Sequence, residues 1–396
     1  MLERMRSTRS TARLAVAGLA LAFLAGCELG VGSAEAPPAP AATVNIVPAN
    51  QARGVVPTER ITVTAGGGVL DEVTVTDPDG TAVKGRLNDD KTRWRNNSVL
   101  DFATRYTVVA TARNAQGAVT TQKSSFTTVR PKALLHTAVV PLNGETVGVG
   151  LPIQVQLSDP VTDRAAVEKR LVVESSPEVE GAWHWIGDDK LRYRPKEYWP
   201  AGTEVTLKVR LQGVDAGDGV FGDEQRDVSF TVGRSVRSLV DVRALRMKVY
   251  IDDRLARTIP ITAGKKGWET RNGIKVALEK HKIKIMDAAT VGIDPDDPDY
   301  YRLRVRWTIR VTWSGEFVHG AQWSTAAQGR ERVSHGCVGM SLTNAEWFFH
   351  QTRRGDIIEV VHSPTSRTME LDNGFGDWNL TWSEWTEGSA LAGAAA

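Results

Sequence analysis

Cysteine is nearly absent from this chain: of its 396 residues only Cys27 and Cys337 carry a thiol. A framework of several disulfides is therefore excluded. Beyond the N-terminal residues, no apolar run is long enough to span a bilayer as a helix. Neither sign of charge dominates, since 49 Lys and Arg residues face 47 Asp and Glu residues. The sequence therefore lacks the basic footprint of a protein that binds nucleic acid.

The N-terminus has the pattern of a bacterial export signal. Four arginines within residues 4–13 precede a short apolar run, residues 14–25, and the sequence Leu-Ala-Gly-Cys ends at Cys27. This ending resembles the lipobox of bacterial lipoproteins, in which the cysteine is acylated; an ordinary signal peptide is the alternative. We expect residues 1–27 to be a lipoprotein signal and the Pro- and Ala-rich residues 28–42 to be a flexible linker. Lipidation of Cys27 would rule out a disulfide within the chain.

The rest of the chain, some 370 residues, is too long for one hydrophobic core. Up to about residue 232, short segments of alternating apolar and polar residues are separated by turn sequences rich in Asp, Asn and Gly, and no convincing amphipathic helix lies among them. The pattern of residues 100–129 recurs in residues 198–232. We predict two immunoglobulin-like β-sandwiches, residues 43–131 and 132–234. Trp94, Trp183 and Trp185 are their expected core residues.

A third domain is predicted for residues 235–363. It continues the strand pattern, and Asp294 to Asp299 reads as a polar loop. After Cys337, Thr343-Asn-Ala-Glu346 has the form of a capping box, which predicts a helix from Thr343 to about Arg354 that ends at Gly355. The fold class expected for the chain is therefore mainly β, with two sandwiches followed by a β-rich catalytic domain that carries one main helix.

The C-terminal extension, residues 364–396, is rich in tryptophan. Trp378, Trp382 and Trp385 lie within eight residues, and leaving three indole rings in water is unfavourable. We expect the extension to pack back onto the catalytic domain. Exposed aromatic side chains that contact sugar are the alternative.

Two histidines shortly precede the second cysteine and suggest nucleophilic catalysis by a thiol. His319 ends a predicted strand and Cys337 follows a loop, so the two can face each other. We assign Cys337 as the nucleophile and His319 as its base and acid, and expect the imidazolium to lower the pKa of the thiol. The N–H groups of Gly336 and Cys337 suit an oxyanion hole. No Asp or Asn lies next to His319 in the sequence, so the carbonyl of Gly320 is the expected group that orients the ring.

The same residues allow two other interpretations. Cys337 could be a buried, inert cysteine and His319 a histidine satisfied at a strand end. Alternatively, His319, His335 and Cys337 could bind zinc together with a fourth ligand such as His350 or His362, although zinc sites favour closer ligand pairs. We expect no metal and no cofactor.

The pattern of His319, fourteen intervening residues and Ser334-His-Gly-Cys337 resembles the signature of the L,D-transpeptidases, the enzymes with a YkuD-type catalytic domain. The segments 260–264, 269–273, 345–348 and 355–361 also look like that family. The whole arrangement, from lipobox to Trp-rich tail, is similar to its longer actinobacterial members. Within the motif the resemblance implies that His335 is a supporting residue near the nucleophile and that Ser334 braces it.

The resemblance also implies a reaction and a place in the cell. Such enzymes act on peptidoglycan stem peptides: the thiolate attacks a tetrapeptide donor, D-alanine leaves, and an amine of a neighbouring stem resolves the thioester into a 3→3 cross-link. Carbapenem β-lactams are expected to acylate the same thiol. Tyr301, Met286 and Trp323 match residues of the donor pocket. The family usually has Asn where this chain has Gly339, which puts donor binding in doubt. The protein would work in the cell wall, anchored by lipid to the outer face of the cytoplasmic membrane.

Two further functions stay open from the sequence. Water could replace the amine acceptor, which would make the protein an L,D-carboxypeptidase with the same thioester. The protein could instead be a non-catalytic lipoprotein whose sandwiches bind the wall. The simplest role for the sandwiches is to act as spacers between the membrane and the active site.

Overall fold

The computed structural model describes residues 40–392. Cys27, the predicted signal and nearly all of the predicted linker lie outside this range. The described chain is mainly β with three short α-helices, which confirms the predicted fold class. No helix within residues 40–392 has the length and apolar character needed to cross a lipid bilayer.

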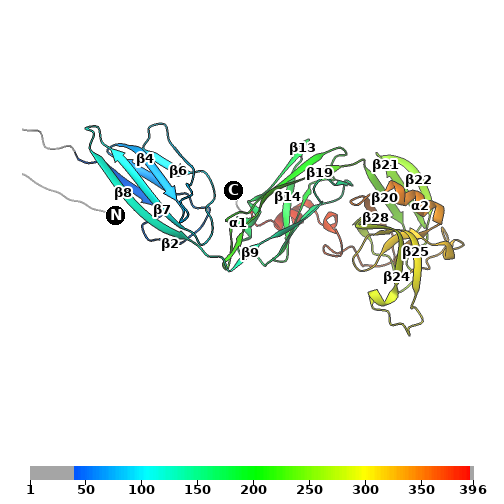
Figure 1. Ribbon diagram of the computed structural model, residues 1–396. Helices are drawn as coiled ribbons and strands as arrows, with labels where there is room; N and C mark the ends of the chain where they lie inside the picture. Colours follow the sequence, from blue (N-terminus) through cyan, green and yellow to red (C-terminus); the bar gives the residue numbers. More distant parts are fainter. Residues whose placement is uncertain (1–39, 393–396) are drawn as a thin grey trace, which may run out of the picture. The chain divides into compact units, whose positions relative to one another are not determined.

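The first sandwich consists of two four-stranded sheets, with strand orders β1-β3-β6-β5 and β2-β8-β7-β4 (Figure 1). Alternation in β7 shows how the sequence builds it, because Tyr106, Val108 and Ala110 are buried between partly exposed neighbours. Trp94 is buried, as predicted. The strands are β1 (Thr43–Val47), β2 (Arg53–Val55), β3 (Thr62–Gly66), β4 (Val69–Thr76), β5 (Gly85–Leu87), β6 (Arg93–Asn96), β7 (Arg105–Arg113) and β8 (Val119–Thr128).

The second sandwich has the sheets β10-β12-β15-β14 and β11-β19-β16-β13, with a small sheet β17-β18-β9. Trp183 and Trp185 are buried in its core, as predicted. Its strands are β9 (Ala133–Leu135), β10 (Thr137–Val140), β11 (Thr146–Val147), β12 (Ile153–Leu157), β13 (Leu171–Ser176), β14 (Gly181–Ile186), β15 (Lys190–Pro195), β16 (Glu204–Arg210), β17 (Asp215–Gly217), β18 (Val220–Gly222) and β19 (Gln225–Val232). A short helix, α1 (Arg164–Glu168), was not expected here. It is too short to show helical periodicity, and Asp163 caps it by accepting a hydrogen bond from the Ala166 N–H.

The third domain, the predicted catalytic domain, is built from a five-stranded sheet, β22-β21-β20-β28-β23, and a four-stranded sheet, β24-β25-β26-β27. Apolar side chains from the two sheets and one helix form its core, including Val240, Val318, Met340 and Phe348. The strands are β20 (Val236–Asp241), β21 (Arg246–Ile251), β22 (Arg254–Pro260), β23 (Gly273–Val276), β24 (Glu279–Asp287), β25 (Arg302–Arg310), β26 (Phe317–Gly320), β27 (Val338–Met340) and β28 (Ile357–Val361). Short 3-10 turns are η1 (Ala288–Val291) and η2 (Gln322–Ser324).

The helix after Cys337 exists, but its predicted boundaries are wrong. Helix α2 spans Leu342–Gln351 and its N-cap is Ser341, whose hydroxyl accepts a hydrogen bond from the Asn344 N–H at 3.3 Å. Thr343 therefore lies inside the first turn, and the helix starts directly after β27. At the other end Thr352 has an extended backbone, so the helix ends at Gln351, four residues before Gly355. Ser341 is the N-cap, and Thr343 is not, because the helix begins immediately after β27 and Ser341 is the single residue between the two elements.

The C-terminal extension packs on the catalytic domain only in part. Its residues 367–373 bond to Asn272, Trp313 and Ser314 of that domain, whereas its tryptophan-rich part packs on the second sandwich. It contains η3 (Asp377–Asn379) and α3 (Trp382–Glu387). The Asn379 side chain bonds to the backbone of β23, but Trp385 stacks on His184 of β14, with ring centroids 4.6 Å apart. The Arg194 guanidinium lies 4.8 Å from the Trp385 ring centroid. The tail packs on the second sandwich because the His184 ring and the buried Arg194 guanidinium there form favourable contacts with indole rings.

A buried ion pair and a backbone contact complete this attachment. Arg192 of β15 is 2 % exposed at its side chain, and its Nη1 lies 3.2 Å from Asp377, which is fully buried. The Trp385 indole N–H donates to the Ala182 carbonyl at 2.9 Å. The tail therefore ties the catalytic domain to the second sandwich.

Removing the Trp385 ring is predicted to destabilise the chain strongly. Trp385 has no exposed surface, and truncating a buried tryptophan to alanine costs about 3–5 kcal/mol. Urea unfolding followed by circular dichroism should show a clear loss for Trp385→Ala and a smaller one for Trp382→Ala, because Trp382 is only partly buried. Equal losses in the two variants would contradict the docking role of Trp385.

Candidate active site

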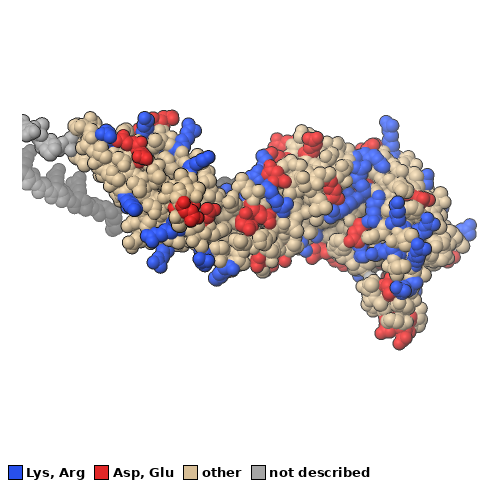
Figure 2. Space-filling model, in the orientation of Figure 1, with Lys and Arg blue, Asp and Glu red and all other residues tan. Residues whose placement is uncertain are grey.

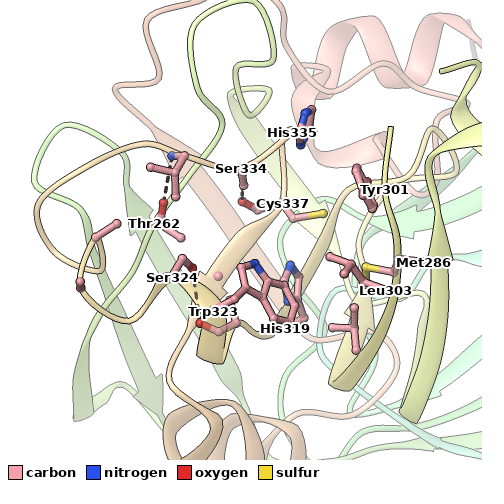
Figure 3. A pocket seen from close by; sticks show the side chains of 16 residues that line it. Thr262, Met286, Tyr301, Leu303, His319, Trp323, Ser324, Ser334, His335 and Cys337 are labelled. Carbon is pink, nitrogen blue, oxygen red and sulfur yellow. Dashed lines mark hydrogen bonds between the residues drawn. The ribbon is translucent and has the colours of Figure 1, made fainter. Parts of the chain in front are cut away.

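Pairing of two short strands brings the predicted catalytic residues together. Strands β26 and β27 are parallel, with Val318 opposite Val338 and His319 opposite Gly339. Cys337 directly precedes β27, so it lies beside the strand that carries His319. Figure 3 shows both side chains at the wall of one cavity. The structure thus assembles residues that are separated by a seventeen-residue loop in the sequence.

The cavity measures about 460 Å³ and is largely apolar. No Lys, Arg, Asp or Glu is among the sixteen residues that line it. Eight of the residues singled out in the sequence line it, namely Met286, Tyr301, His319, Trp323, Ser334, His335, Cys337 and Gly339. Gly320 and Gly336 lie beside it without forming its wall.

His319 is 5 % exposed and has a fixed orientation. Its Nδ1 lies 2.9 Å from the Gly320 carbonyl oxygen, the partner expected from the sequence, so the Nδ1–H donates there. In the neutral ring Nε2 is then left without a proton and can accept one. The Trp323 ring stacks on the imidazole at a centroid distance of 5.8 Å. Burial lowers the pKa of His319, more than the Gly320 hydrogen bond raises it.

Cys337 is 6 % exposed, and the expectation of a lowered thiol pKa is wrong for this state of the protein. Burial raises the pKa of Cys337 to about 12, with a further rise from the Glu316 carboxylate. The Phe317 N–H and the Lys275 ammonium act in the opposite direction. Within the described residues the sulfur bonds to the Gly315 carbonyl, 3.7 Å away, and not to His319. The resting pair is therefore a neutral thiol and a neutral imidazole.

The turn that presents Cys337 is held by a serine and needs a glycine. The Ser334 hydroxyl donates to the Cys337 carbonyl at 2.6 Å and accepts from the Gly336 N–H at 3.3 Å. Gly336 has φ of 109°, a conformation that favours glycine. The Thr270 hydroxyl donates to the Gly336 carbonyl at 2.8 Å. Because the Gly336 N–H already has an acceptor, the expected oxyanion hole loses one of its two donors in this state.

His335 lies on the other side of the nucleophile in an aromatic and acidic setting. Its ring centroid is 5.2 Å from those of Trp268 and Tyr301. Its Nε2 lies 3.3 Å from Asp299 in the connection between β24 and β25, and Asp299 also contacts Lys265 at 2.5 Å. Asp294, Asp296 and Asp297 of this connection are exposed. Figure 2 shows acidic side chains at the lower right tip of the molecule, where Figure 1 places the end of β24.

Gly339 has a steric reason to be glycine. Its backbone N–H and carbonyl both bond to Thr262, at 3.0 Å and 2.8 Å. A Cβ placed on Gly339 would lie 2.9 Å from the Thr262 side chain, closer than real Cβ contacts, and 3.0 Å from Ala321 Cβ, which is a tight contact. Thr262 and Ala321 thus occupy space that a side chain at position 339 would need.

The zinc alternative has no assembled ligand set in the part of the chain from residue 40 to residue 392. The metal-ligand atoms of His319, His335 and Cys337 do not cluster within 4.8 Å of one another. His362 instead contacts Asp241, and His350 lies against the Trp307 and Phe349 rings. A separate group of His136, Asp223 and Glu224 does meet this spacing on the second sandwich. There Arg226 lies 3.1 Å from Glu224, which disfavours a bound cation.

Sequence reasoning missed several residues of the site. Thr262 and Ala321 line the cavity, and neither has a side chain that signals chemistry. Lys275 and Glu316, which are buried near Cys337, are 41 positions apart in the sequence, so no local pattern joins them. Thr262 could have been noticed because it falls in the segment 260–264, which already resembled a known family.

Two family models match the chain and define its class. Residues 52–215 match the bacterial Ig domain, and residues 235–360 match the L,D-transpeptidase catalytic domain. The chain is thus an Ig-like region followed by a catalytic domain of the kind that the motif around Cys337 had indicated.

Curated relatives extend this similarity over most of the chain. L,D-transpeptidase 2 of Mycobacterium tuberculosis is 39 % identical over 332 residues, which cover 84 % of this chain and 81 % of the relative. L,D-transpeptidase 5 of the same species is 33 % identical, with coverage of 92 % and 80 %. The solved structure of the L,D-transpeptidase LdtMt1 in complex with imipenem is 34 % identical, covers 59 % of this chain and 100 % of its own, and gives a TM-score of 0.52. The chain belongs to the L,D-transpeptidase family.

The raised pKa of Cys337 predicts how the resting thiol reacts with pH. Alkylation by iodoacetamide requires the thiolate, so its rate should keep rising from pH 7 to pH 10 without reaching a plateau. The rate can be followed by mass spectrometry of the peptide that contains Cys337. A plateau below pH 8 that disappears in His319→Asn would instead indicate a thiolate–imidazolium pair.

Proposed function

We propose that this protein is a peptidoglycan L,D-transpeptidase that forms 3→3 cross-links through a thioester on Cys337. The observation that carries the proposal is the His319 ring, whose Nδ1–H is held by the Gly320 carbonyl while the ring and the thiol line one cavity. This arrangement gives the nucleophile a base of defined tautomer. Membership of the L,D-transpeptidase family supports the choice of substrate.

The first half of the reaction forms the acyl-enzyme. As the donor tetrapeptide enters the cavity, Nε2 of His319 takes the thiol proton, and the sulfur of Cys337 attacks the carbonyl carbon of the third residue. The His319 imidazolium then gives that proton to the nitrogen of the terminal D-alanine, and the C–N bond breaks. Free D-alanine leaves, and the stem remains bound to Cys337 as a thioester.

The second half transfers the acyl group to an amine. A side-chain amine of a neighbouring stem attacks the thioester carbonyl, and His319 accepts the proton that the amine loses. The C–S bond breaks, and the sulfur recovers a proton from His319. Burial raises the pKa of Cys337 and lowers the pKa of His319, so the neutral pair is favoured before substrate enters the cavity. This limits reaction of the thiol with unrelated electrophiles.

The apolar cavity favours particular parts of the donor. Met286, Leu303 and Val305 form one side, and Trp323 covers the imidazole at the other. This surface suits the aliphatic part of the third stem residue, and Tyr301 lies close to the thiol. A carbapenem that reaches the same thiol would acylate Cys337, and the solved structure of LdtMt1 in complex with imipenem supports binding of such a compound here.

Incubation of the purified protein with a disaccharide tetrapeptide should produce a dimer that has lost one D-alanine, detected by mass spectrometry. Cys337→Ala should abolish it, and His319→Ala should reduce it by about 10²-fold or more, because general acid–base catalysis contributes at least that factor. Release of D-alanine without dimer would indicate a carboxypeptidase. Dimer formation by Cys337→Ala would overturn the thioester mechanism.

We also propose that the protein is exported and held at the outer face of the cytoplasmic membrane by a lipid on Cys27. The lipobox-like sequence that ends at Cys27 supports this proposal. Cells that express the protein and are fed labelled palmitate should yield a labelled band. The label should be absent in Cys27→Ser and unchanged in Cys337→Ala. A labelled Cys27→Ser protein would contradict the proposal.

A further inference from the structure

A buried cluster of charges lies behind the nucleophile, and the mechanism above does not use it. Lys275 on β23 has no exposed surface, and Glu316, the residue before β26, is 4 % exposed. The Lys275 ammonium donates to one oxygen of Glu316. The other oxygen accepts hydrogen bonds from the Arg271 backbone N–H at 3.0 Å and from its guanidinium at 3.2 Å. Removing charges from water is costly, so a buried cluster of this kind calls for a reason.

The cluster touches the segments that hold Cys337. Gly315 and Phe317, on either side of Glu316, supply the carbonyl and the N–H that face the sulfur. A Cβ placed on Gly336 would lie 3.7 Å from a carboxylate oxygen of Glu316, so the carboxylate packs against the residue before the nucleophile. A negative charge at this place opposes formation of a thiolate, and a cation bound to it offsets that effect.

We propose that Lys275 is a positioning residue for catalysis, which acts through Glu316 to stabilise the Cys337 thiolate. Glu316 fixes the Gly315–Phe317 segment around the sulfur, and the Lys275 charge keeps the carboxylate from suppressing ionisation. The other titratable or charged groups near the thiol are Tyr301, Arg310, His319 and His335, and Arg271 reaches this cluster through its ion pair with Glu316. The inference rests on the proposed role of Cys337 as the nucleophile, but it concerns the ionisation of the thiol and not the substrate.

The test measures alkylation of Cys337 in the full chain from pH 6 to pH 10, because this reaction needs no peptidoglycan. In Lys275→Met, Arg271 still forms its ion pair with the Glu316 carboxylate. The pH profile should therefore move upward by about one unit, which makes alkylation about tenfold slower at a fixed pH. Adding Glu316→Gln to this variant removes the opposing charge as well and should restore the parental rate or exceed it. Such a rescue is not expected if the pair serves only stability.

Lys280→Met is the control, because Lys280 is a partly buried lysine of the same domain that bonds to the Thr352 carbonyl and lies over the Phe349 ring. Its profile should match that of the parent. Thermal unfolding checks that each variant is folded. A folded Lys275→Met with the parental profile, or a double variant as slow as Lys275→Met, would overturn the proposal.

A second variant covers the case in which Lys275→Met fails to fold. Glu316→Gln alone should be alkylated no more slowly than the parent, and a slower reaction would overturn the proposal. Cross-linking is measured separately with the disaccharide tetrapeptide. Loss of cross-linking with the predicted alkylation profiles would count against the proposed function alone, and the reverse result would count against the role of Lys275 alone.

Discussion

The parallel pairing of β26 and β27 is the constraint on which the active site depends. Three register pairs place the strand that carries His319 beside the strand that begins after Cys337. Burial stabilises this pairing, because Val318, Val338 and Met340 belong to the hydrophobic core that also contains side chains of α2. Catalytic geometry in this protein is therefore a product of packing: a shift of one residue between these strands would turn their side chains to the opposite face.

Burial then sets the electrostatic character of the site. A thiol and an imidazole in a cavity without charged walls both favour their neutral forms, and the buried charges of Lys275 and Glu316 near the thiol are paired with each other. The Cys337 sulfur is therefore held as a thiol in a low-dielectric cavity, and its ionisation depends on the group that enters the cavity. The same burial explains why the Gly320 carbonyl suffices to orient His319, since a neutral ring needs direction more than charge compensation.

Much of this could be predicted from the sequence, and the failures have physical causes. Strand alternation and turn residues predict the mainly β fold because both are local signals, and the motif from His319 to Cys337 is compact enough to be recognised. The thiol pKa was not predictable, because it depends on burial by residues distant in the sequence. The capping-box pattern shows the limit well: Thr343 and Glu346 fit it but lie inside α2, whereas Thr381 and Glu384, which had not been singled out, form a true capping box at α3. A capping-box sequence shows only that a residue could be an N-cap. Where the preceding strand ends determines which of the possible residues is the N-cap.

The attachment of the C-terminal tail has a consequence for how such proteins can be recombined. The chain leaves the catalytic sheet after β28 and returns to the second sandwich, where Trp385 and Asp377 are covered by residues that precede the catalytic domain in the sequence. A shuffling event that moved residues 235–396 alone into another gene would leave an indole ring and a carboxylate without their complement. Among residues 40–392, His184, Ala182 and Arg192 of the second sandwich cover Trp385 and Asp377, so the second sandwich would have to move together with the catalytic domain.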